Sequence, residues 1–207
     1  MTHAARELVD GLVRMVRHRD PQTGMHLDAV GALSRRLAEQ LGYDEAFVER
    51  VELAGRLHDV GKHTVPIDIL LKPAPLDAEE WNEMRLHPEY GATIVDCFPP
   101  LQPLVEIVRL HHERVDGNGY PQRRIGSEIP IESRIIAVAD AFHAMTVVRP
   151  YAPARTPGSA LGELMRCANT QFDGECVEAF IATFGGRAVV SAADLADTDA
   201  LARRSTA

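Results

Sequence analysis

Residues 54–62 read AGRLHDVGK and place an adjacent histidine and aspartate, His58 and Asp59, behind a run of helix-forming residues. Apolar residues recur before them at helical spacing, and His58 falls on the same stripe. The pattern predicts a helix over 44–59 that is capped by Asp44. A histidine on the core-facing stripe of a helix has either a buried hydrogen-bond partner or a role in a site, and the rest of the chain must decide between the two.

Helical periodicity continues along the chain, and no segment alternates as a strand would. Thr23 is the expected cap of the second helix, and Asp77 with Glu80 has the pattern of a capping box. Besides 44–59, helices are predicted over 4–19, 24–41, 77–86, 88–97, 131–147, 157–170 and 173–184, with a further apolar stripe over 104–111. We therefore expect an all-α bundle of about eight helices, formed by residues 1–184, and a partly disordered tail over 185–207.

Composition limits the class of function. The 207 residues carry 22 basic and 30 acidic side chains, a net charge of −8, which argues against binding a nucleic-acid polymer. The three cysteines include no CxxC pair, so a reduced, cytoplasmic setting is expected. No run of about 18 apolar residues is present, so no membrane span is expected.

A second polar stretch is HHERVDGNGYP, residues 111–121. It opens a segment, 113–130, that holds too many glycines and prolines for a regular element, and long loops of this kind are often functional. DGNG is also an ordinary turn sequence, and Tyr120 could equally pack on a neighbouring helix. The stretch is thus either a polar turn or half of a site.

Histidines and carboxylates from separate predicted helices share one property, because they lie on apolar stripes or at helix ends. One such histidine is more often a hydrogen-bonded core residue than a ligand. Several together favour a metal site in the bundle interior, with nitrogen and oxygen ligands that suit Fe, Mn, Ni, Co or Zn. The candidates are His26, His58, Asp59, His87, His111, His112 and Asp140.

The segments around these positions resemble the HD-GYP family, a subgroup of the HD superfamily of metal-dependent phosphohydrolases. The resemblance covers nearly all of residues 1–184 and is most specific where GYP follows HHE. It is carried, in order, by TGMH (23–26), AGRLHDVGK (54–62), LKPAPLDAEEWNEMRLHPEYGATIV (71–95), HHERVDGNGYP (111–121), IPIESRIIAVADAFHAMT (129–146) and RPY (149–151).

The resemblance implies a phosphodiesterase that hydrolyses cyclic di-GMP to pGpG or GMP through a hydroxide shared by two divalent ions, Fe or Mn being favoured. His26, His58, Asp59 and Asp140 would hold one ion. Asp59 would bridge to a second, which His87, His111 and His112 also hold. Lys62 would neutralise a phosphate oxygen, and Tyr120 and Arg149 would contact the substrate.

Four positions depart from the family pattern. Gln22 replaces a glutamate found in members with three ions, which favours two. His143 replaces the second acid of ADxxDA, three residues after Asp140, and could reach the substrate site as a hydrogen-bonding group. Ala152 removes a basic residue common after RPY. His63 replaces an apolar residue and is expected on a loop surface.

These departures leave alternatives open. The chain could be a catalytically weak signalling module that binds a ligand, or a protein partner through the loop that begins at Arg114 and includes GYP (residues 119–121), the GYP loop. It could also hydrolyse another cyclic dinucleotide or a nucleotide phosphate. The helix over 4–19 could pair with a second copy and support a homodimer.

Overall fold

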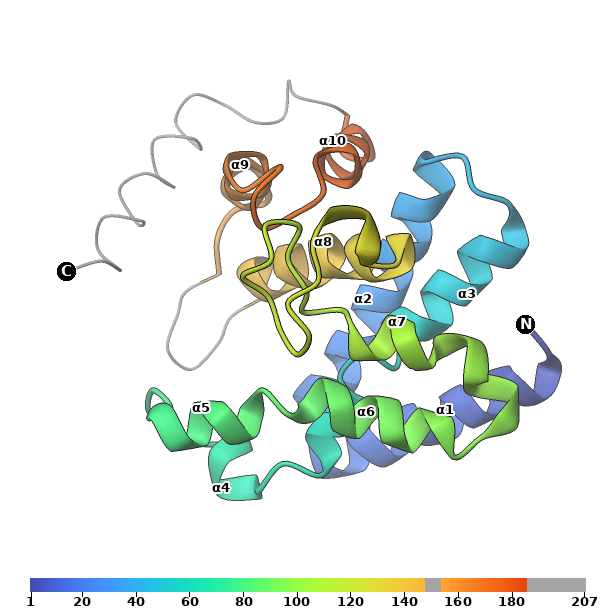
Figure 1. The fold of residues 1–207 in the computed structure, drawn as a ribbon, viewed down its shortest axis with the longest axis vertical. Coiled ribbons are helices and arrows are strands. Elements are labelled where there is room, and N and C mark those ends of the chain that lie inside the picture. The colour runs from blue at the N-terminus through green and yellow to red at the C-terminus, as the bar shows by residue number, and fades with distance from the viewer. Residues whose placement is uncertain (148–153, 186–207) are drawn as a thin grey trace.

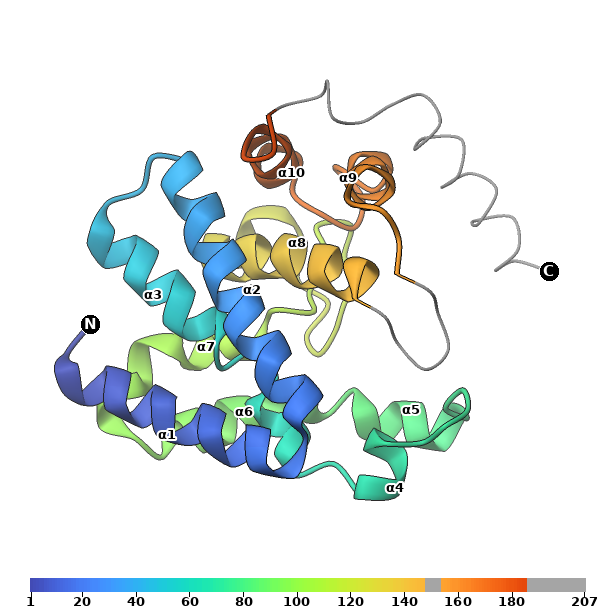
Figure 2. The same cartoon turned by 180° about the vertical axis from the view of Figure 1, so that it is seen from behind.

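A computed structural model of the protein describes residues 1–147 and 154–185, and every regular element within these ranges is a helix (Figures 1 and 2). No strand occurs in this part of the chain, where β-type pairing is limited to isolated bridges. The predicted all-α class is confirmed. The α-helices are α1 (His3–Arg19), α2 (Pro21–Gln40), α3 (Glu45–Gly55), α4 (Ile67–Leu70), α5 (Ala78–Met84), α6 (His87–Asp96), α7 (Val105–Arg109), α8 (Ile131–Thr146), α9 (Pro157–Arg166) and α10 (Gly174–Ala182), and the 3-10 helices are η1 (Val60–His63), η2 (Pro99–Leu104) and η3 (Gly126–Glu128).

Aspartate side chains cap the starts of several helices. Asp44 accepts a hydrogen bond from the backbone N–H of Phe47 at 2.8 Å, and Asp77 forms the predicted capping box with Glu80. Asp173 caps α10 in the same way. Each cap satisfies backbone donors that the first turn of a helix leaves unpaired.

The predicted start of the second helix is wrong by one turn. Asp20, rather than Thr23, is the cap, because its carboxylate accepts from the backbone N–H of Gln22 at 3.0 Å. Pro21 then occupies the first turn, where a missing N–H costs nothing. The Asp20-Pro21 pair therefore ends α1 and also begins α2.

The predicted end of the third helix also differs. α3 ends at Gly55 rather than near residue 59. The Nδ1–H of His58 donates to the Gly55 carbonyl at 2.7 Å, and the backbone continues in tighter turns into η1. His58 and Asp59 consequently lie in a turn, which lets adjacent residues face one site.

Helix α8 lies in the middle of the molecule and contacts α2, α7, α9 and α10 (Figure 1). Helix α2 crosses α8 on the side that faces the viewer in Figure 2, and it packs on α1 and α3. Helix α6 packs on η1 and α7. The core between them consists of aliphatic and aromatic side chains such as Leu27, Leu37, Leu57, Ile135 and Phe180. No helix in the described ranges has both the length and the apolar character that a membrane crossing needs.

Three predictions fall on residues that the structure does not describe. Arg149, Ala152 and the tail residues 186–207 lie outside the described ranges.

A close backbone approach joins η1 to α6. A Cβ on Gly61 would lie 2.0 Å from the His87 carbonyl oxygen and 2.4 Å from the Gly91 nitrogen. Only a glycine fits this contact, which holds the start of α6 against the turn that carries Asp59.

Replacing Gly61 with alanine should therefore lower the free energy of unfolding by roughly 1–3 kcal/mol, because the backbone of α6 must shift. Gly11→Ala is the matched control, since the space beside Gly11 is open and alanine favours a helix interior by about 0.5–1 kcal/mol. Denaturant unfolding measures both. An unchanged unfolding midpoint for Gly61→Ala would show that the contact is not tight.

Candidate metal centre

The structure brings all seven predicted ligands together at the junction of α2, α6, α8 and the turns after α3 and α7. They form two groups whose nitrogen and oxygen atoms lie within 4.8 Å of one another. The Asp59 group contains Asp59, His87, His111 and His112, and the His26 group contains His26, His58 and Asp140.

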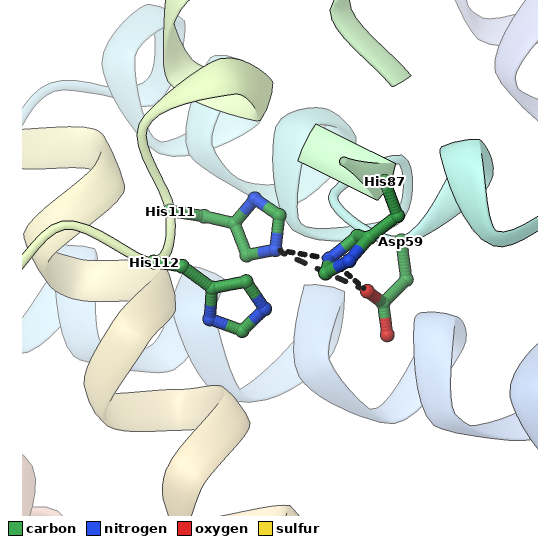
Figure 3. Close-up of side chains that lie close together, drawn as sticks. All are labelled: Asp59, His87, His111 and His112. Atoms are coloured by element: carbon green, nitrogen blue, oxygen red, sulfur yellow. Dashed lines mark hydrogen bonds and ion pairs between the residues drawn. The ribbon is translucent and has the colours of Figure 1, made fainter. Parts of the chain in front are cut away.

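In the Asp59 group, Asp59, His87 and His111 are buried and His112 is half-buried; Figure 3 shows how the four side chains lie. His87 Nε2 lies 3.1 Å from Asp59 Oδ1 and 3.3 Å from His111 Nε2. His111 Nε2 is 3.9 Å from the same carboxylate oxygen. His112 lies beside them, with its ring centroid 4.1 Å from that of His111.

The His26 group has a similar arrangement. His26 Nε2 lies 3.1 Å from Asp140 Oδ1 and 3.3 Å from His58 Nε2. The other oxygen of Asp59, Oδ2, is 3.3 Å from His58 Nε2 and 3.6 Å from His26 Nε2. One carboxylate thus offers Oδ1 to the first group and Oδ2 to the second.

Backbone carbonyls orient three of the histidines. His58, His87 and His111 each donate Nδ1–H to the carbonyl three residues earlier, at 2.7, 2.7 and 2.6 Å. The three acceptors lie in the last turns of α3, α5 and α7. This bond fixes the tautomer and leaves the Nε2 lone pair directed into the site, as a metal ligand requires.

The donor set fits divalent cations. With Nδ1 as the donor, the Nε2 atoms of His87 and His111 present lone pairs to each other at 3.3 Å, and neither can donate. Asp59 Oδ1 is buried and has no hydrogen-bond partner. A cation between these atoms satisfies all three, and mixed imidazole and carboxylate ligands suit Fe, Mn, Co, Ni or Zn.

Electrostatics also favours positive charge here. Burial opposes ionisation of Asp59, but Lys62 and His58 outweigh it and hold the Asp59 pKa well below its usual range. Burial likewise opposes ionisation of Asp140, and His26 and His58 hold its pKa low. Despite its burial, His58 has a raised pKa because of Asp59, so a proton on His58 balances part of this negative charge, and a bound cation can take the place of that proton.

Two imidazoles of the Asp59 group stay neutral. Burial lowers the pKa of His112 to about 3, and burial, followed by the proximity of the His112 imidazole, lowers the pKa of His111 well below its usual value. Neutral imidazole is the form that binds a metal, so no proton competes at these two residues near pH 7.

The structure places three of the predicted substrate-site residues beside these groups. Lys62 Nζ lies 2.5 Å from Asp59 Oδ2. The Tyr120 ring lies 4.8 Å from the His112 ring, and the backbone N–H of Tyr120 donates to the His112 carbonyl at 3.2 Å. Burial and then the charges of Asp59 and Asp140 raise the Tyr120 pKa, so its phenol stays protonated.

His143 reaches the His26 group from α8. Its Nδ1 lies 2.8 Å from His26 Nδ1. If His26 directs its Nε2 lone pair to the site, its Nδ1–H donates to His143 Nδ1. His143 then accepts the hydrogen bond that a backbone carbonyl accepts from each of the other three histidines.

The remaining departures lie outside both groups. Gln22 is exposed on the first turn of α2. His63 is half-buried rather than a surface residue, and its Nδ1 is buried without a hydrogen-bond partner. Burial and then Arg19 lower the His63 pKa.

Sequence reasoning missed Glu113, which holds the GYP loop. Its buried carboxylate accepts from the backbone N–H groups of Gln122 at 2.6 Å and Arg124 at 3.0 Å. These two hydrogen bonds hold residues 122–124, which follow GYP, against the residue next to His112. The sequence feature that could have identified Glu113 is its position directly after His111 and His112, within the HHE motif.

Comparisons with known proteins agree with this geometry. A family model for the HD domain matches residues 10–176. The chain is 41% identical over 177 residues to a cyclic di-GMP phosphodiesterase of Thermotoga maritima, across 84% of this chain and 48% of that protein. It is 39% identical over 180 residues to the 3′3′-cGAMP-specific phosphodiesterase 2 of Vibrio cholerae, across 86% of this chain and 34% of that protein.

A solved structure shows the same fold. Bd1817, described as a HDG"Y"P protein from Bdellovibrio bacteriovorus, aligns with a TM-score of 0.63 at 22% identity, over 78% of this chain and 52% of that one. The chain spans about half the length of the Thermotoga protein and about a third of the Vibrio protein. The chain has the His58–Asp59 pair, His87 directly after α5, and the segment in which GYP follows HHE. It therefore belongs to the HD domain family and to the HD-GYP group within it.

Proposed function

We propose that this chain is a binuclear-metal phosphodiesterase that hydrolyses cyclic di-GMP to pGpG, GMP or both. The observation that carries the proposal is the Asp59 carboxylate, whose two oxygens face two separate groups of ligands. A hydrolase that cleaves phosphodiesters by in-line attack commonly holds two ions that share a ligand in this way.

The proposed ligands are the seven residues of the two groups, with Asp59 common to both. Divalent ions bound there would supply Lewis acidity, which lowers the pKa of a water molecule and withdraws charge from a phosphodiester. The chain itself contributes neutral, oriented imidazoles and a buried setting that strengthens electrostatic interactions. Imidazole and carboxylate ligands of this kind bind Fe, Mn, Co, Ni and Zn.

Substrate contacts are proposed for Lys62, Tyr120, His143 and Arg149. The Lys62 ammonium is already held at the shared carboxylate, from which it can reach a phosphate oxygen. Tyr120 carries a protonated phenol beside His112 and can donate a hydrogen bond. Arg149 lies outside the described residues, so its contact is proposed from the RPY motif alone.

A second candidate substrate is 3′3′-cGAMP. The relatives named for the two substrates are similar to this chain to nearly the same degree, 41% and 39%. His143 also replaces an acid of the family pattern, which can alter substrate handling. A protein partner at the GYP loop, a homodimer and a cytoplasmic location remain predictions from the sequence.

The turnover assay uses protein purified without oxygen and loaded with Mn²⁺ or Fe²⁺. We expect release of pGpG or GMP from cyclic di-GMP, with 3′3′-cGAMP, a nucleoside monophosphate and bis(p-nitrophenyl) phosphate as comparison substrates. Cleavage of another phosphoester without cleavage of a cyclic dinucleotide would overturn the proposal. Metal-loaded protein that cleaves nothing would favour the signalling-module alternative.

Paired lysine variants show whether the activity belongs to this site. Lys62→Met should lower kcat/KM roughly 100-fold, because a cation at the reacting phosphate is lost. Lys72→Met is the control, since Lys72 is similarly exposed and pairs with Glu80 away from both groups. Equal activities of the two variants would contradict the role of Lys62.

Metal content tests the shared carboxylate. Asp59→Asn should lose both ions, whereas Asp140→Asn should lose one and His87→Gln the other. Elemental analysis of the purified variants gives the metal-to-protein ratio directly. Retention of both ions by Asp59→Asn would show that the carboxylate does not bridge.

His143 should act on the ion of the His26 group. His143→Ala removes the acceptor for His26 Nδ1–H and should weaken metal binding about 10- to 100-fold. His143→Asp supplies another acceptor and should keep the affinity. Competitive chelator titration measures both variants, and equal losses would mean that His143 does not orient His26.

A further inference from the structure

Arg85 lies at the edge of the Asp59 group. It is the residue directly after the last turn of α5 and two residues before His87. The carbon of its guanidinium lies 5.7 Å from the centroid of the Tyr120 ring and 5.9 Å from that of Trp81. Tyr120 in turn packs on His112, so a continuous row of contacts runs from the guanidinium to a proposed metal ligand.

Arg85 differs from several other arginines of the chain because no carboxylate in the described ranges pairs with it. Arginines such as Arg35, Arg50 and Arg134 form ion pairs with carboxylates. Arg85 is exposed and forms no ion pair with any carboxylate of the described ranges. An arginine placed over two rings and without an acid partner presents its N–H edge to an anion.

The chemistry of the substrate supplies such an anion. A cyclic dinucleotide contains two phosphodiesters, and hydrolysis at the two ions uses one of them. The other keeps its negative charge and must bind to a chain whose net charge is −8, so a local cation is needed. Resting on the proposed function, we infer that Arg85 binds the phosphate that is not cleaved.

The two rings explain why an arginine serves here. Contacts with Trp81 and Tyr120 restrict the side chain, so less conformational freedom is lost when a phosphate binds. The planar guanidinium can then donate two parallel hydrogen bonds to phosphate oxygens. Lysine would keep the charge but not this paired geometry.

The test separates binding of the second phosphate from cleavage of the first. Trp81 is the one tryptophan of the chain, is 48% exposed and lies beside Arg85, so its fluorescence reports on this edge of the site. Metal-loaded protein is mixed with cyclic di-GMP, and in parallel with 3′3′-cGAMP, and Trp81 emission is recorded by stopped flow before turnover. Steady-state KM is measured for the same substrates and for bis(p-nitrophenyl) phosphate, which has one phosphodiester.

Arg85→Gln should raise Kd and KM for the cyclic dinucleotides about 10- to 100-fold, as expected when a charge-assisted hydrogen bond is lost. Its kcat and its kcat/KM for bis(p-nitrophenyl) phosphate should stay within about threefold of the wild type. The Kd and KM of Arg85→Lys for the cyclic dinucleotides should lie between those of the wild type and those of Arg85→Gln. Arg14→Gln, a change of another exposed arginine on α1, should have no effect.

The possible outcomes separate the role of Arg85 from the proposed function. Unchanged Kd and KM in Arg85→Gln overturn the inference, as does an equal loss on bis(p-nitrophenyl) phosphate, which would indicate a deformed site. Wild-type protein that binds cyclic dinucleotides without cleaving them overturns the proposed function, yet the Kd ratio still tests Arg85. Wild-type protein that does not bind them overturns both.

Discussion

The hydrogen bond from a histidine Nδ1–H to the carbonyl three residues earlier is the interaction on which this structure depends. It occurs at His58, His87 and His111, at the ends of three different helices. At Gly55 and Val108 the carbonyl that would continue the helix accepts from a histidine side chain instead, whereas at Met84 the residue four positions later is Pro88, which has no N–H to donate. In all three places the bond directs Nε2 toward the site, so at α3 and α7 the same carbonyl marks the end of the helix and orients a ligand.

Packing then brings the three helix ends together. Gly61 admits the backbone of α6 at a distance that no other residue allows, and this places His87 beside Asp59. Glu113 fastens the GYP loop behind His112 through two backbone N–H groups. The partial negative charge of the helix C-termini adds to that of Asp59 and Asp140, so the fold concentrates negative potential where cations are proposed to bind.

Periodicity predicts the helices and caps well because both depend on nearby residues. Asp44 and Asp77 cap as expected, although Asp20 takes the place of Thr23, and the long loop after His112 is confirmed. The end of α3 could not be read from apolar spacing, since a side-chain bond to Gly55 decides it.

The site was only partly accessible from the residues themselves. Polar residues on apolar stripes indicated a buried centre, but the division into two groups came from the family resemblance. Distances across α2, α6 and α8 depend on long-range packing that sequence patterns do not carry. Glu113 and Arg85 were missed because a lone charged residue in a polar stretch has no distinctive pattern.

The shared carboxylate of Asp59 links the folding of this chain to the chemistry of its surroundings. The unfolded chain cannot assemble seven ligands from five separate segments, so ions that bind them bind the native state alone. Free metal at 100 times its dissociation constant would add about 2.7 kcal/mol of stability for each independent site. The supply of divalent metal in the cell would thereby help to set how long the protein survives.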